Sequence, residues 1–114
     1  MRICIFSGSR SEYGLLKKII LDLQNDSFFK TDFLVSGSHL EKNFGYSIDQ
    51  IYKDNIWVKK KIKINVKNDK NWHIANAFSE VTKKTNNFFL NKRYDLIILL
   101  GDRYETFATA VSAY

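Results

Sequence analysis

The stretch YDLIILLGDRYE at residues 94–105 decides the fold of this chain. Residues 96–100 are consecutive apolar side chains that do not alternate with polar ones, and Gly101 follows them. Such a run is typical of a strand that is buried on both faces, as the central strands of parallel sheets are. Its carboxyl end carries three charged residues: Asp102, Arg103 and Glu105. Open α/β sheets bind ligands at that end of their strands, so the stretch predicts part of a binding site.

The start of the chain repeats this plan. Residues 3–6 are apolar, and residues 7–11 form a turn of small residues that contains Arg10. The spacing of Ser9 and Glu12 matches a capping box, which predicts that a helix begins here. We expect the two turns to lie at the same edge of one sheet and to frame half of an active site.

The remaining pattern alternates helices and strands. We expect a helix with an apolar stripe over residues 15–23, a strand at 33–35, a loop or short helix over 36–48, a third strand or bent pair of strands over 56–66, and a helix over 72–90. With the first and last strands, this order predicts one α/β domain with a doubly wound, Rossmann-type parallel sheet flanked by helices.

The helical pattern that follows Asp102 is still apolar where the sequence stops at Tyr114. It has no Gly and no basic last turn, which are the signals on which helices usually end. We therefore expect residues 1–114 to be the amino-terminal piece of a longer protein.

The net charge of +6 and the pI near 9.4 raise the question of a nucleic-acid partner. Seven lysines fall between Lys53 and Lys70, where Ile62, Ile64 and Val66 alternate with polar residues. This alternation is the pattern of a strand with one wet face, and lysine on an exposed strand discourages edge-to-edge aggregation. A solvated sheet edge is favoured over a basic binding patch, so no nucleic-acid partner is expected.

Cys4 is the only cysteine, which excludes an internal disulfide and favours a buried thiol in a reducing compartment. No apolar run approaches the roughly 20 residues that a membrane helix needs, and the first strand is too short for a secretory signal. We therefore expect a cytoplasmic protein with no membrane partner.

The turn between Gly8 and Gly14 fits neither the dinucleotide fingerprint nor the phosphate loop, because five residues separate the glycines. A helix amino terminus with free backbone amides and the Arg10 guanidinium beside it remains, and this is a candidate anion site. The alternative is that Arg10 pairs with a surface carboxylate.

Three other residues have both a functional and a structural interpretation. Asp102 either is partly desolvated, pairing with Arg103 or Arg10 or acting in proton transfer, or it caps the next helix. Glu105 is a site residue or a first-turn acid favoured by the helix dipole, and His39 is a site residue or a structural donor.

No Cys, His or Asp cluster has metal-ligand spacing and no Ser lies in a nucleophile elbow, so neither metal nor covalent serine chemistry is indicated.

Taken together, SGSRSEYGLL at 7–16, SGSHLEKNFG at 36–45 and LLGDRYET at 99–106 resemble the amino-terminal domain of the hydrolysing UDP-N-acetylglucosamine 2-epimerases of sialic and legionaminic acid biosynthesis. The resemblance covers nearly the whole chain. It implies a glycosyltransferase-B arrangement of two Rossmann-like domains facing a cleft. Residues 1–114 would then be an incomplete first domain, without the rest of that domain and without the second domain.

The resemblance also implies a reaction: UDP is eliminated from UDP-N-acetylglucosamine, and water adds to the resulting glucal to give N-acetylmannosamine. Asp102 matches the acid of the family's GDR(Y/F)E motif and is the expected catalytic residue. The expected substrate-binding residues are those at family site positions: Arg10 near the phosphates, Glu12, His39, Arg103 and Glu105. By this resemblance, the non-hydrolysing epimerases carry a Lys five positions after the Arg that matches Arg10. This chain has Leu15 at that position, which favours the hydrolysing branch.

No cofactor is implied, the partner is a UDP-sugar substrate, and the full-length protein is expected to be a homo-oligomer. This chain alone is not expected to turn over substrate. Three alternatives stay open: a non-catalytic nucleotide-sugar binding fragment, a UDP-diacetylbacillosamine 2-epimerase, and a receiver- or flavodoxin-like module that shares the turn chemistry by chance.

Overall fold

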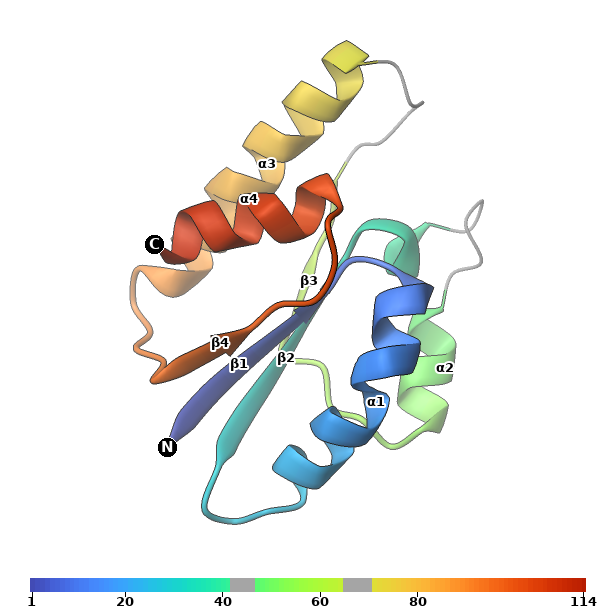
Figure 1. Cartoon of the computed structure of the whole chain (residues 1–114), viewed down its shortest axis with the longest axis vertical. Helices are drawn as coiled ribbons and strands as arrows, with labels where there is room; N and C mark the ends of the chain where they lie inside the picture. Colours follow the sequence, from blue (N-terminus) through green and yellow to red (C-terminus); the bar gives the residue numbers. More distant parts are fainter. Residues whose placement is uncertain (42–46, 65–70) are drawn as a thin grey trace.

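The computed structural model describes residues 1–41, 47–64 and 71–114. Within these ranges, four strands and five helical segments follow one another along the chain (Figure 1). In order they are β1 (Arg2–Ser7), α1 (Arg10–Gln24), β2 (Lys30–Ser36), the 3-10 helix η1 (Gly37–Leu40), α2 (Ile48–Lys53), β3 (Lys60–Ile62), α3 (Asn71–Phe89), β4 (Leu96–Ile98) and α4 (Tyr104–Ala113). None of the helices in the described ranges combines the length and the hydropathy of a membrane span.

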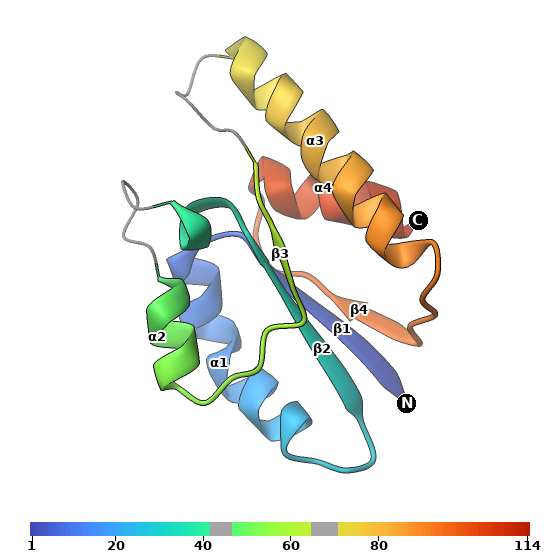
Figure 2. The same ribbon diagram turned by 180° about the vertical axis from the view of Figure 1, so that it is seen from behind.

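The strands form one parallel sheet in the order β3-β2-β1-β4. Helices α1 and α2 lie on one face of the sheet and α3 and α4 on the other, and Figure 2 shows the same two layers from behind. The α/β prediction with a parallel sheet between helices is therefore confirmed.

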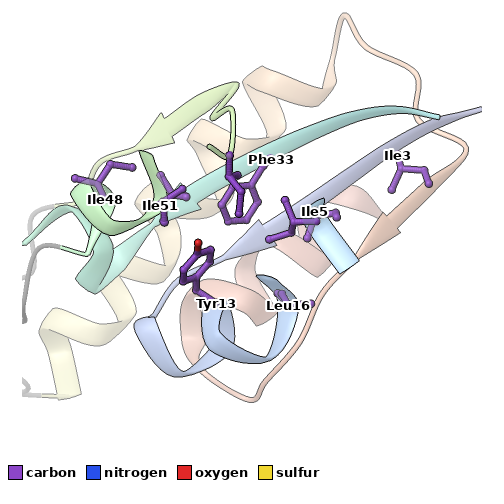
Figure 3. Close-up of a cluster of buried hydrophobic side chains, with 10 residues drawn as sticks. Ile3, Ile5, Tyr13, Leu16, Phe33, Ile48 and Ile51 are labelled. Carbon is purple, nitrogen blue, oxygen red and sulfur yellow. The ribbon is translucent and has the colours of Figure 1, made fainter. Parts of the chain in front are cut away.

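Successive residues of a strand point to opposite faces, so β1 contributes to two cores. Ile3 and Ile5 pack with Phe33 against α1 and α2, where Tyr13 and Ile51 meet them (Figure 3). On the opposite face, Cys4, Phe6 and Leu34 form a second buried cluster beneath Phe88 and Phe89 of α3. Both faces of β1 are thus covered, and β1 is a central strand.

The prediction for residues 96–100 is correct in type and wrong in burial. This segment contains the strand β4, but β4 pairs only with β1 and forms an edge of the sheet. Leu96 is 45% exposed and residues 97–100 are half-buried. An apolar run indicates that a strand favours burial, but burial also requires neighbouring elements that cover the strand. Within the described residues, no strand lies beyond β4.

The lysine-rich segment forms the opposite edge. Its regular strand is limited to β3, with Ile62 and Ile64 buried and Lys60, Lys61 and Lys63 exposed. The predicted wet edge strand is therefore confirmed, although it is shorter than residues 56–66, and the end of that range with Val66 lies outside the described residues. The predicted loop or short helix at 36–48 contains η1 and only the first residue of α2, Ile48; the rest of α2 lies beyond that range and is not predicted, and residues 42–46 lie outside the described part.

Candidate functional site

The carboxyl ends of β1 and β4 lie at one edge of the sheet, because the two strands are parallel neighbours with Ile5 opposite Ile98. We call this edge the carboxyl rim. Residues 7–9 begin at the last residue of β1, Ser7, and residues 101–103 follow β4, so Arg10 and Asp102 both belong to this rim. The predicted sharing of one edge by the two turns is confirmed.

The first of these turns, residues 7–9, is buried, and its polar groups form hydrogen bonds within the chain. The amides of Gly8 and Ser9 donate to Glu12 Oε2 at 2.7 and 3.1 Å, and the Glu12 amide donates to Ser9 Oγ at 3.4 Å. This is the predicted capping box. The expected anion site with free amides is corrected in part, because these three amides already have acceptors.

Glu12 joins this turn to the last helix. Its side chain is buried, and Oε1 accepts a hydrogen bond from Thr106 Oγ1 at 3.3 Å. Burial raises the pKa of Glu12, and hydrogen bonds from Gly8 and Thr106 counteract part of that rise. Gly101 comes so close that a Cβ there would lie 2.6 Å from Glu12 Oε1, so glycine is needed where the turns meet.

Glu105 is a second buried carboxylate at the rim. It is fully buried, and its two oxygens accept from Nε and Nη2 of Arg103, each at 3.1 Å. This hydrogen bonding raises the pKa of Arg103. The Arg103 side chain itself is 46% exposed. A guanidinium that faces solvent is therefore bound by a carboxylate that is buried in the protein.

Asp102 lies beside this pair and is exposed. Helix α4 has Arg103 as its N-cap residue and no side-chain cap hydrogen bond, so the capping interpretation of Asp102 is wrong. The expected partial desolvation and the pairing with Arg103 are also not observed, because Arg103 turns to Glu105. In the part of the chain that the structure describes, the Asp102 carboxylate makes no hydrogen bond or ion pair and remains available.

Arg10 is exposed at the first position of α1. Its guanidinium has no carboxylate partner among residues 1–41, 47–64 and 71–114, so the proposed pairing with a surface carboxylate is not observed there.

His39 lies beneath the rim and is fully buried. Its Nε2 lies 2.7 Å from Ser7 Oγ, and its Nδ1 lies 2.5 Å from Ser47 Oγ. Burial lowers the pKa of His39 to about 4, so the ring is neutral at pH 7 and one nitrogen donates while the other accepts. This bridge fits the structural-donor interpretation, and no local sequence pattern indicates that Ser7 and Ser47 complete it.

The chain matches a family model. The model of UDP-N-acetylglucosamine 2-epimerase matches residues 21–114. Among curated relatives, polysialic acid biosynthesis protein P7 of Escherichia coli is 33% identical over 112 residues, which are 98% of this chain and 29% of the relative. GDP/UDP-N,N'-diacetylbacillosamine 2-epimerase (hydrolyzing) of Campylobacter jejuni is 31% identical over 96% of this chain and 28% of its own length. The chain therefore spans less than a third of either relative.

Solved structures agree on the fold. UDP-GlcNAc 2-epimerase of Neisseria meningitidis, bound to UDP-GlcNAc, superposes with a TM-score of 0.83 at 18% identity, over 100% of this chain and 29% of that one. UDP-GlcNAc 2-epimerase of Methanocaldococcus jannaschii gives a TM-score of 0.77 at 16% identity, over 99% and 28%. Both share the sheet and its helices with this chain. Because the family model covers most of its residues, the chain belongs to the UDP-N-acetylglucosamine 2-epimerase family.

Proposed function

We propose that the chain is the amino-terminal part of a hydrolysing UDP-N-acetylglucosamine 2-epimerase, which converts UDP-N-acetylglucosamine to N-acetylmannosamine and UDP. The observation that carries this proposal is the arrangement of residues 101–103. They present the Asp102 carboxylate, which makes no hydrogen bond or ion pair within the described residues, next to the Arg103 guanidinium, which Glu105 holds in place. The name of the C. jejuni relative supports the hydrolysing branch and a bacillosamine context, and the name of the E. coli relative supports a polysialic acid context.

The chemistry needs a base and a stabilised leaving group. As the C1–O bond breaks, its electron pair leaves with UDP, and the positive charge at C1 acidifies the C2 proton. In this proposal Asp102 takes that proton, which leaves a C1=C2 double bond. Water then adds across that double bond, with its oxygen at C1 and a proton at C2, which gives N-acetylmannosamine as its cyclic hemiacetal. Arg103 and Arg10 supply positive charge for the leaving diphosphate.

Glu12 and His39 have a supporting role in this proposal. Both are buried, and their polar atoms bind other residues of the chain. They hold the rim in shape beneath the substrate. For the full-length protein we propose a second domain that supplies the remaining residues of the active site. We also propose a homo-oligomeric assembly and a cytoplasmic location.

A chimaera tests the proposal. The chain replaces the matching amino-terminal segment of the E. coli relative, and UDP release and N-acetylmannosamine formation are measured with UDP-N-acetylglucosamine. The parent chimaera should be active, and Asp102→Asn should lower kcat by about 100-fold or more because the base is removed. Asp22→Asn is the matched control, since Asp22 is an exposed carboxylate paired with Lys18 on α1. Unchanged turnover in Asp102→Asn would contradict the assignment of Asp102.

A second candidate is supported by the exposed guanidinium groups of Arg10 and Arg103 at the carboxyl rim, which offer positive charge to a diphosphate without supplying a base. A non-catalytic nucleotide-sugar binding fragment would bind UDP-N-acetylglucosamine without releasing UDP. The same assay separates the two functions, because binding without turnover in the parent chimaera selects the fragment. Turnover of UDP-N,N'-diacetylbacillosamine in preference to UDP-N-acetylglucosamine would identify the related epimerase instead.

A further inference from the structure

We propose that Glu105 is a positioning residue that fixes the Arg103 guanidinium for the diphosphate of a nucleotide ligand and does not touch the ligand itself. This inference rests on the proposed function and differs from the expectation that Glu105 binds substrate. It starts from an asymmetry within one ion pair. The Arg103 side chain is 46% exposed, whereas that of Glu105 is 1% exposed.

The two-point contact determines where the guanidinium points. Nε and Nη2 of Arg103 each donate to a different oxygen of Glu105 at 3.1 Å, so the planar group can neither rotate nor shift without breaking a bond. A guanidinium carries five N–H donors. Two of them face the carboxylate, which leaves three for an anion on the exposed side.

Backbone from two other strand ends holds Glu105 in place. A Cβ on Gly8 would lie 3.3 Å from Glu105 Cβ, and a Cβ on Gly37 would lie 2.8 Å from Glu105 Oε1 and 2.5 Å from the Gly8 oxygen. Gly37 also has a φ of +60°, which favours glycine. Thus the turns after β1 and β2 form a close-fitting wall around a carboxylate that comes from α4.

Burial makes the pair obligatory. Removing a carboxylate from water costs free energy unless a cation compensates it, and Arg103 is the cation that contacts Glu105. Glu12, the other buried acid nearby, only adds negative charge. Arg103 is therefore held at the rim before any ligand arrives, which reduces the entropy lost on binding.

The same geometry keeps a ligand away from Glu105. Both carboxylate oxygens are occupied, the side chain is inside the wall, and an approaching phosphate would be repelled by a negative charge. Any effect of Glu105 on anion binding must therefore pass through Arg103. This predicts non-additive effects when both residues are changed.

The test uses the 15N-labelled chain, with pyrophosphate and UDP as separate probes. In the parent, the Arg103 Nε–H signal should exchange with water at least about tenfold more slowly than that of exposed Arg10, and pyrophosphate should shift it. Glu105→Gln should weaken pyrophosphate binding about tenfold or more. Glu80→Gln is the control, because Glu80 also holds a cation, Lys84, but on α3. The double variant Glu105→Gln/Arg103→Ala should bind no more weakly than Arg103→Ala.

Each outcome bears on one claim. Fast exchange of the parent Arg103 Nε–H, which requires no variant to fold, would overturn the inference. So would parent binding of pyrophosphate that leaves this signal unmoved, absence of pyrophosphate binding, unchanged binding in Glu105→Gln, or additive losses in the double variant. If pyrophosphate binds through Arg103 as expected but UDP does not bind, the proposed nucleotide ligand is wrong, while the role of Glu105 in positioning Arg103 for a diphosphate stands.

Discussion

The two turns of the carboxyl rim occupy equivalent places after neighbouring strands, yet they differ in almost every physical respect. Residues 7–9, the closed turn, are buried, and their amides and hydroxyls bind groups of the same chain. Residues 101–103, the open turn, are exposed, and the helix that follows them has no side-chain cap hydrogen bond. The closed turn thus behaves as a floor, while the open turn displays its charged groups.

We infer from this difference that the closed turn contributes mainly to the stability of the fold and the open turn mainly to function. A change in the closed turn or in the groups packed on it removes hydrogen bonds or creates clashes in a dry environment, so it should cost folding free energy. A change at the exposed end of the open turn removes only groups that water already solvates, so it should cost function and little stability. Substitutions on each side can test this division.

The largest effect is expected at Gly37, which packs against the closed turn. Gly37→Ala places a Cβ 2.5 Å from the Gly8 oxygen at a φ of +60°, so it should destabilise the fold by about 3 kcal/mol or more. Gly14→Ala is the control, because a Cβ there meets nothing within 4 Å in the middle of α1. That change should stabilise by about 0.5–1 kcal/mol. Urea unfolding measures both, and equal stability of the two variants would refute the wall around Glu105.

Acid should destabilise the protein through His39. Its pKa falls from 6.5 to about 4 on folding, so between these values the unfolded state binds more protons than the folded state. The contribution of His39 to the free energy of unfolding is therefore complete above pH 6.5. It declines as pH falls towards 4, by about 3 kcal/mol in total. Glu12, with its raised pKa, acts in the opposite direction.

The His39 contribution can be isolated by comparing urea unfolding of the parent and His39→Gln at pH 7.0 and pH 4.5. The variant should be the less stable protein at pH 7.0, because it loses the bridge between Ser7 and Ser47. It should also show a shallower loss on acidification. The same loss in both proteins would mean that His39 does not resist protonation in the folded state.

A smaller loss is expected when the cap of α1 is removed. Ser9→Ala takes away the acceptor of the Glu12 amide and should cost about 1 kcal/mol. Ser27→Ala, at an exposed position between α1 and β2, should stay within about 0.5 kcal/mol of the parent. Thermal unfolding of the three proteins checks this. If Ser9→Ala matched Ser27→Ala, the capping box would contribute nothing to the closed turn.

Features that depend on neighbouring residues could be predicted from the sequence. Ser9 and Glu12 are three residues apart, so their capping box follows from local spacing. The shared rim follows from two apolar runs and the parallel order that alternating helices impose. For the same reason, Arg10 and Asp102 could be assigned to one edge before their surroundings were known.

Features that depend on distant residues could not be predicted in this way. Glu105 is buried because Gly8 and Gly37 close over it, and those glycines come from other strand ends. Nothing in the sequence near Glu105 reports that contact, so sequence reasoning leaves the choice between a site residue and a first-turn acid open. The exposure of Leu96 has a similar origin, because the place of β4 at the sheet edge depends on which other strands are present.

The smallest effect on stability is expected at Asp102, where the comparison of the two turns is most easily broken. Asp102→Asn removes an exposed carboxylate that neither caps α4 nor pairs with Arg103, so the free energy of unfolding should change by less than about 0.5 kcal/mol. Urea unfolding of the chain carrying this substitution provides the measurement. A loss above about 1 kcal/mol would show that Asp102 belongs to the floor of the rim. An unchanged stability, combined with the loss of turnover expected in the chimaera, would place its contribution in the chemistry alone.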